Sequence, residues 1–422
     1  MELYALKFKD IFVYVKSQGS LFWLINIYLF FEYVRPQTLY PIINVIPFTK
    51  LILLLALGIL FLRGKFSPVK NTINSLLFLF LLVIVFSSAF ALSPNLAFSN
   101  VADFIAWLVI FFLIINIVNT ENKFLVFMLA FLIYSFKMSQ HSFKGWALGG
   151  FSFSKDGSGG GPGWFNNSGE FGIQMCVLLA LSWYFFVALK ENWSKWKKWV
   201  FFLFPFTALT GTISCSSRGA LVGSCAVLLT MLLKTKYKIK GVVVLTIVLT
   251  LIYLLVPDTQ MNRFRSSGTD NTSKVRLEMW ERGVDLANHF PVLGVGFKNW
   301  GIAQQRIYGL DSMLLPHNIF IECASELGYL GLFVFFLLIL YTFINNHQTR
   351  RLALQNDPEN KFIFNMAHGL DCALVGYLVG GFFVTVLYYP YFWINLAMTV
   401  ALNNIAKKQL INEEIDTISR ED

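Results

Sequence analysis

The sequence has few charged residues. Charged side chains make up 14% of its 422 residues, whereas about 25% is usual for a soluble domain. Hydrophobic side chains make up 56% and aromatic side chains 17%. This composition excludes a soluble globular protein and predicts an all-α polytopic integral membrane protein. We expect no nucleic-acid partner despite the net charge of +10, because basic residues are normally enriched in the cytoplasmic loops of a membrane protein.

Cysteine is also scarce, and the sequence contains no CxxC pair and no cysteine with a histidine at metal-ligand spacing. A Walker-type phosphate loop is missing too, since no GK[ST] follows the glycines of residues 139–168. We therefore expect no metal and no bound cofactor. We interpret residues 139–168 as a flexible outer loop, with an anion-binding nest as the alternative. The cysteines, which we interpret as small core residues, are Cys176, Cys215, Cys225, Cys323 and Cys372.

Long apolar runs, in contrast, are abundant. Since a crossing takes about 20 apolar residues, the sequence predicts about twelve transmembrane helices. The first is expected to be an uncleaved anchor, because residues 1–20 mix charges throughout. The predicted spans are residues 20–34, 42–62, 73–92, 101–119, 124–138, 169–189, 199–216, 218–233, 241–256, 317–345, 363–387 and 390–406.

The basic residues predict the sidedness of these spans. Most of the 34 Lys and Arg residues fall on the side that also holds both termini, which the positive-inside rule makes the cytoplasmic side. The predicted organisation is then nine spans over residues 1–256 with a Gly-rich periplasmic loop at 139–168, a large periplasmic loop at 257–316, three spans over 317–406 and a cytoplasmic tail at 407–422.

The large loop 257–316 carries nearly equal numbers of basic and acidic residues, so most of its charges are expected to be solvated. A helical pattern begins at Ser273, which we predict to be its N-cap. The segment PVLGVGFKNWG is interpreted as a tight turn, because no strand precedes its glycines. Only one or two of the loop arginines are expected to belong to a site, and the residues alone do not say which; the loop holds Arg263, Arg265, Arg276, Arg282 and Arg306.

The stretch LPHNIFIECASELGYLGL at residues 315–332 places His317 at a predicted helix start on the outer side. An imidazole there can act as a general base for a hydroxyl group, or it can simply cap the helix. Asn318, Glu322 and Glu326 follow at intervals of four and share one stripe of the helix. We expect both glutamates to lie deeper and to pack against neighbouring helices, with Glu322 also a candidate to orient the imidazole.

Among the other histidines, His289 in the large loop is the rival candidate for the base. Arg218, in TGTISCSSRGALVG, lies at the start of a predicted span, where the helix dipole favours an anion. Capping of a tight turn is the alternative role for Arg218. Arg35, in FEYVRPQTLYP, is either an ion-pair partner of Glu32 or a substrate contact.

Arginine suits a diphosphate because its planar fork forms two parallel hydrogen bonds to phosphate oxygens. Outer arginines together with a histidine therefore indicate transfer from a phosphate-linked leaving group without a metal. The alternative from the residues alone is an anion transporter, in which arginines and intramembrane glutamates line the path. The candidate site residues cluster on one side of the membrane, which favours an enzyme over a transporter.

Three motifs, SRGALVG, PVLGVGFKNW and PHNIFIECASELGYLGL, together resemble the O-antigen ligase and O-antigen polymerase superfamily over about residues 210–340. The segments FEYVRPQTLYP and NNSGEFG are similar to the exosortase-associated O-glycosylation ligase branch. The resemblance implies an inner-membrane enzyme that works on the periplasmic side. It would take a glycan from undecaprenyl pyrophosphate and join it to a hydroxyl of lipid A-core or of a protein, with inversion and without a metal.

By the same resemblance, Arg218 corresponds to the arginine of the SRG motif and His317 to the essential histidine before asparagine. The second catalytic arginine corresponds best to Arg276. The remaining residues expected to contact substrate are Asn318, Arg263, Arg265, Arg282, Glu322 and Arg35. A repeat-unit polymerase shares this donor and this chemistry and is the runner-up, followed by a non-enzymatic transporter. Membrane lipids are the other expected partners.

Overall fold

The fold was analysed in a computed structural model, which describes residues 3–63, 69–153, 157–161, 165, 167–235, 237–255, 268, 270–310, 314–356 and 361–421. Regular structure in these residues is helical, as predicted. The α-helices are α1 (Phe8–Ser17), α2 (Ser20–Leu29), α3 (Pro36–Leu39), α4 (Phe48–Leu62), α5 (Thr72–Ala89), α6 (Pro94–Ile117), α7 (Glu121–Leu148), α8 (Ser168–Leu189), α9 (Lys195–Ser214), α10 (Arg218–Lys234), α11 (Lys238–Leu255), α13 (Asn271–His289), α14 (Trp300–Tyr308), α15 (Ile319–Asn356), α16 (Lys361–Gly381) and α17 (Pro390–Glu421).

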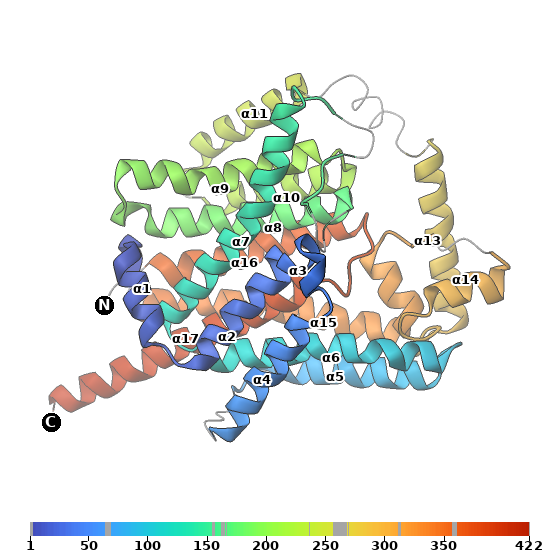
Figure 1. Ribbon diagram of the computed structural model, residues 1–422, viewed down its shortest axis with the longest axis horizontal. Helices are drawn as coiled ribbons and strands as arrows, with labels where there is room; N and C mark the ends of the chain where they lie inside the picture. Colours follow the sequence, from blue (N-terminus) through green and yellow to red (C-terminus); the bar gives the residue numbers. More distant parts are fainter. Residues whose placement is uncertain are drawn as a thin grey trace.

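The long helices form a bundle, and α13 and α14 lie at one end of it (Figure 1). Both chain termini lie at the opposite end, close to α1 and to the end of α17 (Figure 1). The part of the predicted large loop that the structure describes is thus separated from the termini by the length of the bundle. We call the end with α13 and α14 the loop end and the other the termini end.

The protein is a multi-pass membrane protein, but the described residues do not support the predicted count of twelve spans. By length and composition, six helices in the described residues can cross a membrane: α5, α6, α7, α8, α15 and α16. The predicted spans at 42–62 and 218–233 correspond to helices of 15 and 17 residues. A crossing needs about 20 apolar residues, so neither helix qualifies alone.

The other predicted spans fall short for different reasons. The run 20–34 is divided, because α2 ends at Leu29 and a π-helix follows at Phe30–Val34. Helix α9 begins on lysines, which lowers its mean hydropathy. Helix α17 carries buried asparagines, Asn395 and Asn403, within its apolar half. Apolar length alone therefore overcounted the spans.

Helix α15 is broken at Gly328, where φ is 69° and ψ is −178°. A Cβ at this position would lie 2.4 Å from the backbone of Val292, so only glycine fits. The predicted continuous span 317–345 is therefore two helical segments, and the first of them, residues 319–327, packs against the turn at 292–296. This break sets the direction of the segment that follows His317.

Helix α16 ends at Gly381, earlier than the predicted span 363–387. Residues 382–389 then form a connection to α17, which begins at Pro390. We call residues 382–389 the α16–α17 loop. It lies within the loop-end half of the bundle and contacts the segments that carry the predicted site residues.

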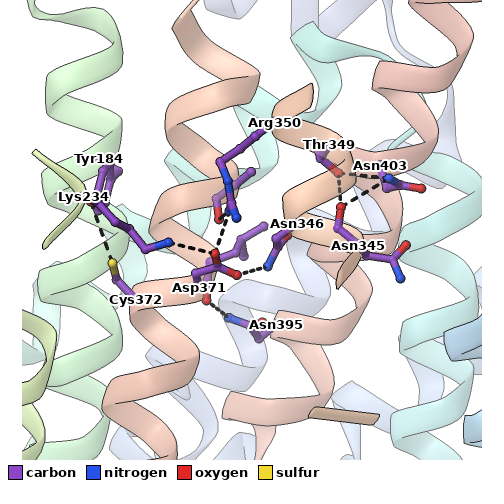
Figure 2. Close-up of polar contacts among 12 residues, drawn as sticks. Tyr184, Lys234, Asn345, Asn346, Thr349, Arg350, Asp371, Cys372, Asn395 and Asn403 are labelled. Carbon is purple, nitrogen blue, oxygen red and sulfur yellow. Dashed lines mark hydrogen bonds and ion pairs between the residues drawn. The ribbon is translucent and has the colours of Figure 1, made fainter. Parts of the chain in front are cut away.

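A buried carboxylate, Asp371, links the helices α10, α15 and α16 (Figure 2). Asp371 on α16 accepts hydrogen bonds from Lys234 Nζ at 3.2 Å and from Arg350 Nη1 at 2.6 Å, and from Asn346 Nδ2 at 2.9 Å. Only 3% of the Asp371 side chain is exposed. Lys234 is the last residue of α10, the helix that begins with Arg218, so this cluster fixes the far end of α10 against α15 and α16.

Four cysteines are buried, as predicted, whereas Cys225 is exposed on α10. A described part of the Gly-rich segment, Ser158, is held in place. Its N–H donates to the carbonyl of Ser214 at 3.0 Å, and its hydroxyl is 2.6 Å from the Ser214 hydroxyl. The rest of that segment around residues 154–156 and 162–164 lies outside the described residues.

Candidate active site

Arg218 is the first residue of α10, directly after a tight junction with α9. Ser216 has a left-handed backbone with φ of 54°, and the Ser217 hydroxyl caps the helix by accepting from Ala220 N at 3.4 Å. Small residues at the junction allow this reversal. The predicted helix start at Arg218 is confirmed, and its side chain points toward α13 rather than into its own turn, as the next contacts show.

The guanidinium of Arg218 binds the start of α13. Its Nη1 lies 3.0 Å from Asp270 Oδ2, and its Nη2 donates to Ser273 Oγ at 3.3 Å. Asp270, and not Ser273 as predicted, is the N-cap, since its Oδ1 accepts from Ser273 N at 3.0 Å. Hydrogen bonds from Arg218 and Ser273 hold the pKa of Asp270 well below its usual range. The ion pair therefore joins α10 to α13.

Helix α13 lies over the turn that contains His317. Trp280 Nε1 donates to the carbonyl of Pro316 at 2.8 Å, and the Trp280 ring contacts Phe382 edge-on at 5.2 Å between centroids. Arg276 precedes Trp280 by one helical turn and so shares its face. Burial, together with the charge of Arg276, lowers the pKa of His317 to about 4. The charge of Arg276 therefore acts on the imidazole of His317.

His317 is held in an unusual backbone conformation. Its φ is 48°, in the left-handed region, and its N–H donates to Thr385 Oγ1 at 2.9 Å. Non-glycine residues in this region cluster at functional sites because the surrounding structure must compensate for the strain. The helix begins at Ile319, so His317 lies two residues before the helix and not in its first turn.

Asn318 is the cap of this helix start. Its Oδ1 accepts from Phe320 N at 2.9 Å and from Ile321 N at 3.2 Å, and only 1% of the residue is exposed. These bonds fix the turn that presents His317. They favour a positioning role for Asn318 over the predicted direct contact with substrate.

Glu322 and Glu326 are each 3% exposed and are bonded to protein groups. Glu322 Oε2 accepts from Leu387 N at 3.2 Å, while Glu326 Oε2 accepts from Lys298 N at 3.1 Å and from the Tyr388 hydroxyl at 3.0 Å. These bonds favour the packing interpretation of both glutamates. The expected deeper position does not fit Glu326, because Lys298 belongs to the predicted outer loop.

Of the other predicted arginines, the two that the structure describes have partners away from His317. Arg282 donates to Gln304 Oε1 at 3.2 Å, is bonded to Glu278, and lies 5.4 Å above the Tyr308 ring, so it faces α14. Arg263 and Arg265 lie outside the described residues. Arg35 has a left-handed backbone and lies 3.9 Å from Glu32, which agrees with the ion-pair interpretation.

The rival histidine, His289, ends α13 and is 71% exposed. Its Nδ1 contacts the carbonyl of Asp285 at 3.0 Å and the Asp285 carboxylate at 3.2 Å. Neither predicted catalytic arginine is bonded to it in the described part of the chain. The geometry favours His317 as the histidine of the site.

Sequence reasoning missed the α16–α17 loop. Thr385 holds His317, Leu387 and Tyr388 hold the two glutamates, and the Tyr389 hydroxyl donates to Glu170 Oε1 at 2.8 Å. The residues of this loop are mostly apolar or aromatic, so the sequence assigned them to the end of a predicted span. The signal that could have found the loop is the tyrosine pair before Pro390, where a helix cannot continue from the preceding turn.

Part of the chain matches a known protein family. Residues 200–336 match the family model described as O-antigen ligase, and that stretch contains Arg218, Arg276 and His317. The chain is thus a multi-pass membrane protein, helical in its described residues, in which residues 200–336 are similar to the O-antigen ligase family.

A relative among characterised proteins is the exopolysaccharide production protein ExoQ of Rhizobium meliloti (strain 1021), 28% identical over 108 residues. The alignment covers 24% of this chain and 25% of that protein, so the chain matches about a quarter of the length of this relative. Neither comparison bears on the exosortase-associated branch.

Proposed function

We propose that this protein is a glycan ligase of the bacterial inner membrane, with its site on the periplasmic side. It would transfer a glycan from undecaprenyl pyrophosphate to a hydroxyl of lipid A-core or of a protein. The match of residues 200–336 to the O-antigen ligase family supports this function. The two segments FEYVRPQTLYP and NNSGEFG support the narrower assignment to the exosortase-associated branch.

The observation that carries the proposal is the grouping of two arginines with one histidine at the loop end. Arg218 binds Ser273 on α13, and Arg276 follows Ser273 by three residues on the same helix. The charge of Arg276 acts on His317. Two guanidinium groups and a neutral imidazole are the donors and the base that release of a pyrophosphate and attack by a hydroxyl require.

In the proposed reaction the acceptor hydroxyl attacks the anomeric carbon from the side opposite the pyrophosphate. The new carbon–oxygen bond forms as the bond to the pyrophosphate breaks, and the leaving group takes the electron pair. His317 accepts the proton of the hydroxyl. Arg218 and Arg276 stabilise the charge that grows on the pyrophosphate. A single displacement inverts the anomeric centre, and cationic side chains supply the charge stabilisation without a metal.

The lowered pKa of His317 fits this role. With a pKa of about 4, the imidazole is neutral at the pH of the periplasm and can accept a proton. A bound pyrophosphate would neutralise much of the charge of Arg276, which would raise the pKa of His317 in the complex. The donor would thereby make the imidazole a stronger base when the acceptor arrives.

Reconstitution tests the function directly. Purified protein in vesicles is given an undecaprenyl-pyrophosphate-linked glycan and, in turn, lipid A-core or a protein acceptor. Discrete transfer to one acceptor, unaffected by a chelator of divalent metals, is the expected result. Uptake into vesicles without bond formation would make the protein a transporter and would refute the proposal.

The similarity to an exopolysaccharide production protein favours a second candidate, which is growth of a glycan chain on the lipid carrier. The donor and the chemistry would be the same, and the acceptor would be the end of a second lipid-linked glycan. A ladder of lengthened donors in the absence of any other acceptor would identify this polymerase.

A further inference from the structure

We propose that Glu170, Tyr389 and Arg35 form a subsite that binds a hydroxyl-rich sugar ring of the donor, next to its pyrophosphate. The subsite rests on the proposed function and specifies which residues would hold the sugar that is transferred. Glu170 and Tyr389 have no role in the chemistry described so far. Arg35 is predicted either to pair with Glu32 or to contact substrate, and the sequence does not indicate that it lies near Glu170 or Tyr389.

Two separate sequence segments converge on Tyr389. Glu170 belongs to NNSGEFG at the start of α8, and its Oε1 accepts the hydroxyl hydrogen of Tyr389 at 2.8 Å. Arg35 belongs to FEYVRPQTLYP, between α2 and α3, and Tyr33 of the same segment is joined through the rings of Phe165 and Tyr391 to Tyr389. The charge of Arg35 also acts on the Tyr389 hydroxyl. The α16–α17 loop thus brings together a carboxylate, a guanidinium and a phenol that lie far apart in the sequence.

A row of aromatic rings packs against Tyr389. Tyr33 lies 6.3 Å from Phe165, Phe165 lies 5.2 Å from Tyr391, and Tyr391 stacks on Tyr389 at 6.0 Å with an interplanar angle of 6°. The Tyr391 hydroxyl also donates to the carbonyl of Glu170 at 2.8 Å. These contacts fix both the Tyr389 ring and the backbone of Glu170, so the polar groups are preorganised.

The chemistry suits a sugar. The Glu170 carboxylate is half-buried, and in the described part of the chain no cation forms a salt bridge with it. It therefore keeps acceptor positions for hydroxyl groups beyond the bond from Tyr389. Arg35, whose side chain is 22% exposed, supplies donors. The half-buried Tyr389 ring offers an apolar face to the C–H groups of a sugar.

Charge argues against a phosphate at this position. Arg35 lies 3.9 Å from Glu32, a buried carboxylate, so its positive charge is already balanced. Glu170 adds a further negative charge. Arg35, Glu32 and Glu170 together therefore carry one net negative charge. A phosphate would be repelled there, whereas it would be attracted to Arg218 and Arg276.

The subsite adjoins the predicted pyrophosphate site. A Cβ on Gly169 would lie 3.1 Å from the Val384 side chain and 3.7 Å from the Ser217 hydroxyl. Ser217 precedes Arg218, and Val384 precedes Thr385, which holds His317. The start of α8 thus lies beside Ser217 and Val384, which are next in sequence to Arg218 and to Thr385. This position is expected for the part of the site that receives the sugar attached to the pyrophosphate.

Binding of two lipids tests the subsite independently of transfer. The full-length protein in nanodiscs is titrated with the undecaprenyl-pyrophosphate-linked glycan and with undecaprenyl pyrophosphate alone. Loss of a hydrogen bond to a charged group costs about 1.5–3 kcal/mol, so Glu170→Gln should weaken binding of the glycosylated lipid about tenfold or more. Tyr389→Phe should also weaken binding of the glycosylated lipid, but by a smaller factor than Glu170→Gln. Binding of undecaprenyl pyrophosphate should stay unchanged in both variants.

Tyr33→Phe is the matched control, because its hydroxyl has no hydrogen-bond partner in the described structure while its ring belongs to the same aromatic row. It should bind both lipids like the wild type. Wild-type affinity of Glu170→Gln and Tyr389→Phe for the glycosylated lipid would overturn the subsite, and so would equal loss of both lipids. A raised KM for the acceptor with unchanged donor binding would also overturn it, since the sugar would then belong to the acceptor. Wild-type protein that binds the donor through Glu170 but transfers nothing would refute the proposed function alone.

Discussion

Trp280 on α13 donates its indole N–H to the carbonyl of Pro316, the residue before His317, at 2.8 Å. This bond holds the helix that carries Arg276 against the turn that carries His317. Trp280→Phe keeps the ring contact with Phe382 but loses the bond, which is worth about 1 kcal/mol. We expect a fall in kcat of about fivefold to tenfold with little change in stability, measured by transfer kinetics and thermal unfolding. Unchanged kcat would show that this bond does not position α13.

The ion pair between Arg218 and Asp270 gives a second prediction. Asp270→Asn keeps a good N-cap for α13 but removes the negative charge that binds Arg218. If Arg218 holds the pyrophosphate, the carboxylate competes with it, so we expect tighter binding of undecaprenyl pyrophosphate in this variant. Asp270→Ala, which also loses the cap, should in addition destabilise α13 by about 1 kcal/mol. Weaker pyrophosphate binding in Asp270→Asn would contradict the competition.

The histidine gives a prediction about pH. Burial and the charge of Arg276 lower the pKa of His317 to about 4, so kcat/KM should fall only as the pH approaches 4 and the imidazole becomes protonated. In Arg276→Gln the positive charge is gone, the pKa rises toward 6.5, and the acidic limb should move to higher pH. The limb for kcat should also lie at higher pH than the limb for kcat/KM, because bound pyrophosphate offsets Arg276. If the acidic limb lay at the same pH in the wild type and in Arg276→Gln, the charge of Arg276 would not act on His317.

The buried cluster around Asp371 gives a prediction about stability. Asp371→Asn leaves the buried charges of Lys234 and Arg350 without their anion, and breaking such a pair costs about 3–5 kcal/mol. Asn403→Ala is the matched control, since Asn403 bonds Thr349 at 3.1 Å beside the cluster but does not touch Asp371 (Figure 2). We expect a large drop in the unfolding temperature for the first variant and a small one for the second. Equal drops would mean that the charge is not what matters.

The local structure around the candidate site residues could partly be predicted from the sequence, because short motifs carry these residues. Arg218 begins a helix, and His317 precedes one, for local reasons of backbone and capping that short segments reveal. The charge of Arg276 acts on His317, as the proposed pairing requires. Arg282, six residues further along α13, was also predicted to contact substrate but faces α14.

The packing of the helices could not be predicted in the same way. Hydropathy measures apolar length but does not show where a helix stops, so α16 ends at Gly381 while the apolar sequence continues into the α16–α17 loop. The break at Gly328 depends on the backbone of Val292, which no local pattern reveals. Glu170 was passed over because its partner, Tyr389, lies in that loop.

The most direct test of the proposed function is transfer by His317→Ala in the reconstituted system. The variant should insert into the membrane and bind the undecaprenyl-pyrophosphate-linked glycan like the wild type, because the pyrophosphate is held by Arg218 and Arg276. General-base catalysis contributes about 10²- to 10⁴-fold, so the transfer rate should fall by at least about a hundredfold. Transfer at the wild-type rate in His317→Ala would contradict the assignment of His317 as the base.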